Sequence, residues 1–260
     1  MADWTSLIEP ARAAALSAGT SILGIYAQPF AVQQKADASP VTQADQLAEA
    51  IIVERLCDLT PDVPVIAEEL AAAGHLPSAA PARFWLVDPL DGTKEFIRRN
   101  GEFTVNIALV ENARPVLGIV HAPALGLTYW TTGSGVLCQR EGGAAEPVAA
   151  RIMPERGAVV VHSRSHADET RLGAYIADVP GAERRVSGSS IKFCLLAAGE
   201  ADLYPRFGRT MEWDTAAGQA ILESAGGSVT TLDGAPLRYG KLGFANPDFI
   251  ARGKPRSNPP

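Results

Sequence analysis

The sequence predicts a mixed α+β and α/β protein in which an antiparallel half is followed by an alternating half. Four apolar runs separated by short turn segments occupy residues 103–140, and strands spaced this closely form an antiparallel meander. After residue 148, strand-like and helix-like segments alternate. With 260 residues and 47% hydrophobic content, the chain is long enough to bury a sizeable core.

Two helices are expected near the N-terminus. Apolar residues recur at helical spacing over residues 3–27, which predicts a helix that covers a sheet. Residues 30–35 then form a short strand, and a loop at 36–40 precedes Thr42, which is placed to cap a second helix ending near residue 59. Asp45 lies in the first turn of that helix. Four apolar side chains form its expected buried face: Leu47, Ile51, Ile52 and Leu56.

An acidic residue follows the next predicted strand, at residues 64–67. Glu68 stands where this strand gives way to a loop, and loops in such places often carry function. The stretch at 70–82 is rich in Ala, Pro and Gly and has no clear period, which indicates a mobile excursion.

The buried strand predicted at residues 85–93 ends in a segment that carries two carboxylates, Asp88 and Asp91. Pro89 restrains the backbone between them and Gly92 permits a sharp turn, so both carboxylates and a main-chain carbonyl can converge on one point. Oxygen ligands without His or Cys suit a hard cation such as Mg²⁺ or Mn²⁺. Taken alone, the same segment also fits an ordinary structural turn.

A polar segment at 94–101 leads into the meander. Its four strands are expected at residues 103–110, 115–122, 127–131 and 135–140. Residues 141–147 are the best candidate for a boundary between an N-terminal half at 1–147 and a C-terminal half at 148–251. Residues 252–260 are expected to form a disordered tail.

The second half should contain four strands and three helices. Strands are expected at residues 158–162, 184–187, 202–206 and 228–232. One helix should end near residue 177, and a second should open at the hydroxyl-rich turn 187–190 and continue through Lys192. A third is expected over 215–225, with Asp214 as its N-cap and two glycines at its end.

Composition limits the classes of partner that this protein is expected to bind. A formal net charge of -6 gives no electrostatic footprint for nucleic acid or an anionic membrane. The three cysteines, Cys57, Cys138 and Cys194, are widely separated among apolar neighbours, which predicts reduced core residues in a cytoplasmic protein. No cationic stretch precedes the first apolar segment, as a signal peptide would require, and no run is apolar enough to span a bilayer.

Four acids stand at the ends of predicted elements: Glu68, Asp88, Asp91 and Asp214. A carboxylate cluster that holds two or more Mg²⁺ ions is a known solution for phosphoryl transfer to water. The hydroxyl of Thr93 could accept a hydrogen bond from an attacking water while it donates to a nearby acid such as Asp45. The alternatives are that Thr93 only satisfies the turn and that Asp214 only caps its helix.

Three motifs resemble those of the inositol monophosphatase superfamily of Mg²⁺-dependent, lithium-sensitive phosphatases: AEE at 67–69, DPLDGT at 88–93 and WDTAAG at 213–218. The longer run at 85–109 is similar to that of the CysQ-type 3'(2'),5'-bisphosphate nucleotidases of this superfamily, and the likeness extends over nearly the whole chain. The resemblance implies a layered αβαβα sandwich of the inositol monophosphatase and fructose bisphosphatase kind. It also implies hydrolysis of the 3'-phosphate of adenosine 3',5'-bisphosphate to AMP and phosphate, a reaction of sulfur assimilation.

The resemblance assigns roles to individual residues. It implies two or three Mg²⁺ ions, with Mn²⁺ as an alternative, held by Glu68, Asp88, the Leu90 carbonyl, Asp91 and Asp214. It implies that the catalytic residues are Asp45, Glu68 and Thr93. The expected substrate contacts are Gly92, Thr93, Ser163, His166, Ser189, Lys192 and Arg206.

The expected partner is therefore a small nucleotide bisphosphate. A homodimer and a peripheral attachment to the inner membrane face stay open. The competing enzyme is an inositol or fructose phosphate phosphatase with the same metal site, and the non-enzymatic alternative is an inactive nucleotide- or phosphate-binding module. Glu95 favours the nucleotidase, because the resembling inositol enzymes usually carry Asn there. Retention of the whole implied ligand set together with Thr93 and Asp45 favours an enzyme.

Overall fold

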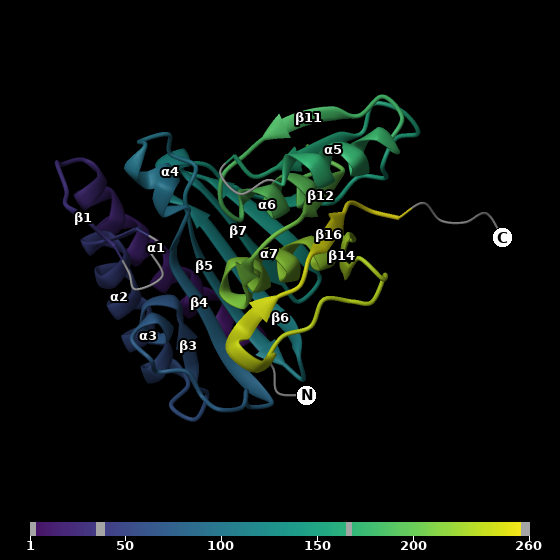
Figure 1. Cartoon of the computed structure of the whole chain (residues 1–260). Helices are drawn as coiled ribbons and strands as arrows, with labels where there is room; N and C mark the ends of the chain where they lie inside the picture. Colours follow the sequence, from purple (N-terminus) through teal and green to yellow (C-terminus); the bar gives the residue numbers. More distant parts are fainter. Residues whose placement is uncertain (1–3, 35–39, 165–167, 256–260) are drawn as a thin grey trace.

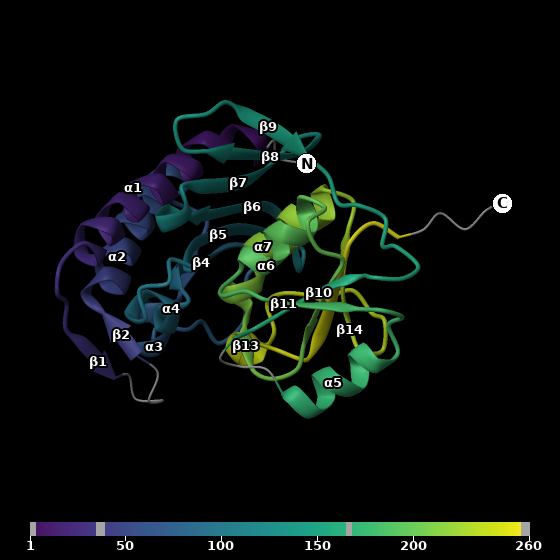
Figure 2. The same ribbon diagram turned by 90° about the horizontal axis from the view of Figure 1, so that it is seen from above.

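The structure is a computed structural model that describes residues 4–34, 40–164 and 168–255. Five layers follow one another: two long helices, a seven-stranded sheet, a pair of helices, a five-stranded sheet and one outer helix (Figure 1, Figure 2). This arrangement confirms the predicted layered αβαβα sandwich. Large hydrophobic cores fill both sides of the seven-stranded sheet, and a smaller core lies beneath the outer helix.

The first layer consists of α1 (Ile8–Tyr26) and α2 (Gln43–Leu59), which pack side by side on one face of the larger sheet (Figure 2). A short 3-10 turn, η1 (Trp4–Leu7), leads into α1, so the helix predicted over residues 3–27 is confirmed within the described part. Between the helices, β1 (Val32–Gln34) and β2 (Pro40–Thr42) form an antiparallel pair. Almost all of the predicted loop at 36–40 lies outside the described residues.

The N-terminus of α2 is capped as predicted. Thr42 has an extended backbone, and its hydroxyl accepts a hydrogen bond from a backbone N–H of the first turn at 3.1 Å. Ile52 and Leu56 are buried and Ile51 is half-buried, but the prediction for Leu47 is wrong, because Leu47 is 42% exposed. The neighbouring position 48 is an alanine that is fully buried, so the buried side of α2 passes beside Leu47.

The larger sheet contains the predicted meander. Its strand order is β3-β4-β5-β6-β7-β8-β9, and neighbours are antiparallel except for β3 and β4. The strands are β3 (Val65–Ala67), β4 (Arg83–Asp91), β5 (Thr104–Glu111), β6 (Arg114–Ala122), β7 (Leu127–Thr132), β8 (Gly135–Arg140) and β9 (Ala145–Val148). A 3-10 turn, η2 (Pro123–Leu125), joins β6 to β7. The unpredicted β9 starts inside the segment expected to separate the halves, and that division stays a prediction.

Glu68 does not lie in a loop as expected, because a short helix, α3 (Glu68–Ala72), follows β3. The excursion predicted at 70–82 therefore begins as a helix. The carboxylate of Glu49 on α2 accepts two backbone N–H groups of α3 at 2.7 and 2.9 Å, which satisfies donors that a helix start leaves free. Because the contact that stabilises the start of α3 comes from α2, the local sequence shows no helical repeat of apolar residues.

The polar segment at 94–101 also contains a short helix, α4 (Thr93–Ile97). Phe96 anchors it, since the ring is fully buried and packs edge-on against Phe103 with the centroids 5.2 Å apart. A single buried aromatic residue, rather than a repeating pattern, therefore places α4 against the core.

The smaller sheet has the strand order β11-β10-β12-β16-β14. Its strands are β10 (Val159–His162), β11 (Glu183–Val186), β12 (Leu203–Arg206), β14 (Ser228–Thr231) and β16 (Phe249–Arg252). The four predicted strands are confirmed, and β16 is added between β12 and β14 by antiparallel pairing on both sides. The predicted tail is therefore wrong at its start, because Arg252 belongs to β16; residues 256–260 lie outside the described part.

Helices α6 (Ile191–Ala197) and α7 (Glu212–Ser224) lie between the two sheets, and α5 (Glu169–Ala177) covers the outer face of the smaller one (Figure 2). A Cβ on Gly218 of α7 would lie 2.4 Å from the ring of Phe193 on α6, so only glycine permits this approach. The remaining short elements are β13 (Thr210–Met211), β15 (Ala245–Asn246) and η3 (Leu242–Phe244).

All three cysteines are free thiols. Cys194 is buried and Cys138 is half-buried, but Cys57 is exposed at the surface of α2, so the core prediction is wrong for that residue. In the part of the chain that the structure describes, no helix is both long and apolar enough to cross a membrane.

Candidate active site

The end of β4 brings two acids into the space between the sheets. Asp88 is almost fully buried, and its Oδ1 accepts the backbone N–H of Leu90 at 3.0 Å. The register with β5 shifts between Asp88 and Asp91, which bends the strand end. Gly92 then takes a φ of +91°, and a Cβ there would lie 3.1 Å from the carbonyl oxygen of Glu102. The sharp turn predicted at Gly92 is therefore confirmed.

Thr93 and Asp45 contact each other, as the sequence predicts. The hydroxyl of Thr93 donates to Asp45 Oδ1 at 3.3 Å and also lies 3.3 Å from the Leu90 carbonyl oxygen. Asp45 Oδ2 accepts both the N–H and the hydroxyl of Thr42 at 2.8 Å. The starts of α2 and α4 therefore position this pair.

Asp214 reaches the site from the start of α7. The prediction that it is the N-cap is wrong, because α7 begins two residues earlier and Asp214 is its third residue. From there, its Oδ2 accepts the N–H of Met211 at 2.8 Å, as the third residue of a capping box does. This bond uses one oxygen of Asp214, and the carboxylate lies within electrostatic reach of Asp91 and Glu68.

Four carboxylates from β3–α3, β4 and α7 are close enough to repel one another: Glu68, Asp88, Asp91 and Asp214. Burial, followed by these neighbours, raises the pKa of Asp88 well above its usual value. Burial and neighbouring carboxylates also raise the pKa of Asp214 to about 8. Burial raises the pKa of Asp91 to about 6, although the Lys192 charge and a hydrogen bond from the Ser190 N–H oppose this rise.

The donor set fits a hard divalent cation. Within the described residues, no group of three His, Cys, Asp or Glu side chains already has the geometry of a metal site. Three of the carboxylates, Asp88, Asp91 and Asp214, instead accept hydrogen bonds from backbone N–H groups. These carboxylates nevertheless supply a concentration of oxygen donors that suits Mg²⁺ or Mn²⁺, and a bound cation would offset their mutual repulsion.

The predicted residues face one open cleft of about 920 Å³, where the ends of β4 and β12 meet the starts of α6 and α7. Those that line it are Glu68, Asp88, Leu90, Asp91, Gly92, Thr93, Ser163, Ser189, Lys192, Arg206 and Asp214. Asp45 lies behind this surface and reaches it through Thr93. His166 lies outside the described residues.

Lys192 is a largely buried residue in the lining of the cleft. Its ammonium group donates to the carbonyl oxygens of Ser187, at 3.2 Å, and Ser189, and it lies over the ring of Tyr204. Ser189 has a positive φ of 43°, a conformation that costs energy for any residue with a Cβ. Lys192 therefore stabilises this turn, and burial lowers its pKa to about 8.

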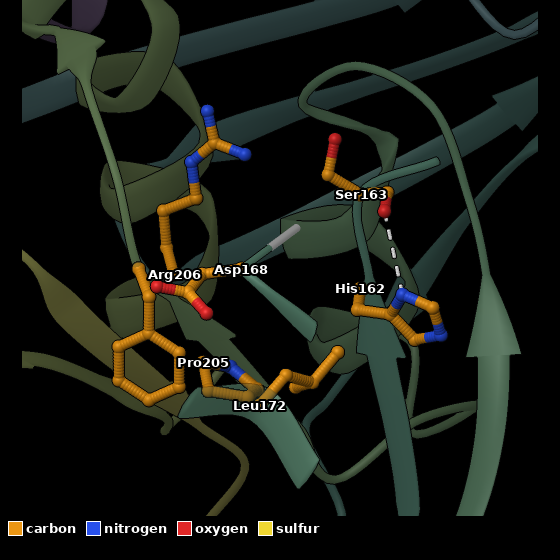
Figure 3. Close-up of a pocket in the computed structure, with 7 residues that line it drawn as sticks. His162, Ser163, Asp168, Leu172, Pro205 and Arg206 are labelled. Carbon is orange, nitrogen blue, oxygen red and sulfur yellow. Dashed lines mark hydrogen bonds between the residues drawn. The ribbon is translucent and has the colours of Figure 1, made fainter. Parts of the chain in front are cut away.

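Arg206 brings a second cation to the cleft from the end of β12, and one of its guanidinium nitrogens donates to the Arg209 carbonyl oxygen at 2.9 Å. A small pocket of about 10 Å³ adjoins the cleft, with Arg206 and Ser163 on its two sides (Figure 3). This pocket has room for about one water molecule. Any larger ligand must therefore occupy the main cleft.

Sequence reasoning missed a buried polar chain behind the acids. Ser190 Oγ donates to Asn106 Oδ1 at 2.6 Å and lies 2.8 Å from Thr104 Oγ1. Thr104 and Asn106 are two apart on β5 and share a face of the sheet. The alternation of polar residues inside an otherwise apolar strand was a signal that could have identified them.

The comparisons agree with the resemblance seen in the sequence. The model of the inositol monophosphatase family matches residues 3–255. The chain is 47% identical over 238 residues to the 3'(2'),5'-bisphosphate nucleotidase CysQ of Escherichia coli (strain K12), which covers 90% of this chain and 95% of the relative. The protein of the same name from Buchnera aphidicola is 39% identical over 253 residues, covering 95% of this chain and 94% of the relative.

A solved structure supports the same conclusion. The crystal structure of CysQ from Bacteroides thetaiotaomicron, described as a bacterial member of the inositol monophosphatase family, has a TM-score of 0.80 to this chain. The two chains are 41% identical, and the match covers 98% of this chain and 99% of the other. Fold, motifs and relatives thus agree, and this protein belongs to the inositol monophosphatase family.

Proposed function

We propose that this protein is a 3'(2'),5'-bisphosphate nucleotidase that hydrolyses the 3'-phosphate of adenosine 3',5'-bisphosphate to AMP and phosphate. Relatives at 46% and 47% identity over most of the chain carry the name of this activity. The observation that carries the proposal is the Thr93–Asp45 hydrogen bond beside four clustered carboxylates. A module that only binds its ligand has no use for such a pair.

The metal ligands in this proposal are Glu68, Asp88, the Leu90 carbonyl, Asp91 and Asp214, and they would hold two or three Mg²⁺ ions. When bound, the ions supply positive charge and Lewis acidity for displacement at phosphorus. In this proposal Glu68 also acts in catalysis together with Thr93 and Asp45.

Thr93 orients the attacking water. Its hydroxyl proton is given to Asp45, so its oxygen is left to accept a hydrogen bond from the water and to fix the direction of attack. The backbone N–H groups of Gly92 and Thr93 at the turn would donate to oxygens of the scissile phosphate. The turn at Gly92 presents these groups without a side chain in the way.

Cationic side chains support a substrate with a second phosphate. Lys192 and Arg206 both line the cleft. With Ser189, Ser163 and His166, they form the expected contact set for the remainder of the nucleotide.

The proposal is tested by phosphate release from the purified protein with Mg²⁺. Adenosine 3',5'-bisphosphate, its 3'-phosphosulfate analogue, inositol 1-phosphate and fructose 1,6-bisphosphate are compared, with Asp88→Asn as the inactive control. We expect the fastest release from the adenosine bisphosphate. Faster release from a sugar phosphate would overturn the substrate, and ligand binding without any release would favour the binding module.

We further propose a cytoplasmic location, a role in sulfur assimilation and inhibition by Li⁺. Inhibition is checked by titrating Li⁺ against a fixed Mg²⁺ concentration, with Na⁺ as the control for ionic strength. Equal effects of the two ions would contradict it. A homodimer and a peripheral attachment to the membrane stay predictions.

A further inference from the structure

We propose that Asn106 is a positioning residue that holds the Asp88 carboxylate from behind and links it to the start of α6. The proposal rests on the proposed function, because it takes Asp88 as a metal ligand. No motif comparison assigns a role to Asn106. Three observations support it: strand register, the fixed direction of a hydrogen-bond chain, and a buried donor without an acceptor.

The strand register places Asn106 beside Asp88. The two residues are paired across β4 and β5, and both are only 1% exposed. Directly opposed residues on antiparallel strands place their side chains on the same face with Cβ atoms about 5 Å apart. Asp91 is paired with Thr104 in the same way. The two acids of β4 therefore face two polar residues of β5.

Alternate residues of β5 face different cores. Val105 and Ile107 belong to the core beneath α1 and α2, whereas Ala108 belongs to the core on the opposite side. Asn106 shares the face of Ala108 and points toward α6 and α7. An amide at this position is therefore directed at the site rather than at the outer helices.

The amide of Asn106 sets the direction of a hydrogen-bond chain. Its Oδ1 faces the start of α6 and accepts the one hydroxyl proton of Ser190 at 2.6 Å, so the Thr104 hydroxyl must donate in its contact with Ser190. Nδ2 is left as the free donor. Ser190 also gives its backbone N–H to Asp91, so the N-cap residue of α6 contacts both Asn106 and Asp91.

Asn106 Nδ2 has no hydrogen-bond partner among the described residues, although it is buried. Buried N–H groups are nearly always paired, so an unpaired one indicates a partner that is engaged in another state. The acceptor that the register offers is the Asp88 carboxylate, whose Oδ1 is already used by the Leu90 N–H. The other oxygen can accept from Nδ2, and this bond would set the orientation in which Asp88 meets a cation.

The test measures metal binding separately from turnover. Mg²⁺ binding is followed by calorimetry and by the rise in Tm that Mg²⁺ causes in Asn106→Leu, which keeps the side-chain size and removes the amide. We expect Mg²⁺ affinity to fall about 10-fold or more, as for other residues that orient a metal ligand. At saturating Mg²⁺, KM for adenosine 3',5'-bisphosphate should change less than about 3-fold.

Thr131→Val is the matched control. Thr131 is fully buried in the same sheet, and its hydroxyl accepts the Gly118 N–H at 3.1 Å away from the acids. This variant should lose stability and keep its Mg²⁺ affinity. An equal loss of affinity in Thr131→Val would assign the effect to general loosening of the sheet and overturn the proposal.

A second variant keeps the proposal testable if Asn106→Leu does not fold. Ser190→Ala removes the donor that orients the amide, so Mg²⁺ affinity should fall in the same direction by a smaller factor. Unchanged affinity in Ser190→Ala, or in a folded Asn106→Leu, overturns the role of Asn106 alone. A parent protein whose Tm does not respond to Mg²⁺ refutes the proposed metal site itself.

Discussion

Replacement of Asp214 with Asn is expected to stabilise the metal-free protein while it abolishes Mg²⁺-dependent turnover. Burial and neighbouring carboxylates raise the pKa of this group from 3.8 to about 8, so its charged form destabilises the fold in the absence of a cation. An Asn side chain can still accept the Met211 N–H that Asp214 Oδ2 accepts at 2.8 Å. The substitution therefore removes the repulsion and keeps the helix start.

The magnitude follows from the pKa. Each unit corresponds to about 1.4 kcal/mol, so the rise to about 8 sets an upper limit of about 5 kcal/mol at pH 7.5. Asp214 keeps part of its surface open to the cleft, where water screens the charges, so we expect a gain of about 2 kcal/mol. For a chain of this size, that gain raises Tm by about 4–8 °C.

The pH dependence has a defined sign. The folded protein holds the Asp214 proton at pH values at which the unfolded chain, with a pKa of 3.8, has released it. The destabilisation is therefore full above about pH 8 and shrinks as the pH falls toward the unfolded value. The metal-free parent should gain stability over this range, and Asp214→Asn should lack that part of the gain.

The assay is urea or thermal unfolding at several pH values, in EDTA and in excess Mg²⁺. Mg²⁺ should stabilise the parent strongly and the variant weakly, because a ligand stabilises only the state that binds it. Asp58→Asn, an exposed change on α2, is the control and should shift stability by less than about 0.5 kcal/mol. A variant that is less stable than the parent in EDTA, or equally stabilised by Mg²⁺, would refute the reasoning.

Three other substitutions test separate parts of the molecule. Thr93→Ala should lower kcat about 100-fold with little change in Mg²⁺ affinity, because it removes a group that orients water. Steady-state rates and a Mg²⁺ titration check this prediction. An unchanged rate would reject the role of Thr93 in orienting water. Gly218→Ala should destabilise the fold by about 1–3 kcal/mol in urea unfolding, since its Cβ would lie 2.4 Å from Phe193; wild-type stability would contradict that packing. Arg151→Ala removes hydrogen bonds of 2.8 and 2.6 Å to the fully buried Asp202, so the free energy of unfolding should fall by about 2–3 kcal/mol in thermal unfolding. A negligible loss of stability would reject this pair as a stabilising contact.

Local sequence pattern determined the long elements. Helical spacing of apolar residues located α1, and short apolar runs between turns located the four meander strands, because both structures repeat with a fixed period along the chain. Thr42 was identified as a cap for the same local reason. The motifs also placed Glu68, Asp88, Asp91 and Asp214 at element ends, where a cluster could form.

Elements without a period of their own were missed. α3 depends on the carboxylate of Glu49, α4 on the buried ring of Phe96, and β16 on pairing with two strands distant in sequence. A strand of four residues between two others has no recognisable pattern in its own sequence, because its partner strands supply the hydrogen bonds. The exposure of Leu47 and Cys57 was likewise decided by what packs beside α2.

The features of the site also divide into those that the sequence predicts and those that only the structure shows. The sequence by itself determined which side chains have the chemistry for a hard cation and an oriented water, since this depends on residue type. The sequence and its family resemblance already paired Thr93 with Asp45, but only the tertiary structure decided that Ser190, at the N-cap of α6, hydrogen-bonds to Asn106 of β5. These two residues are distant along the chain, so the packing of α6 against the larger sheet, and not local pattern, brings them together.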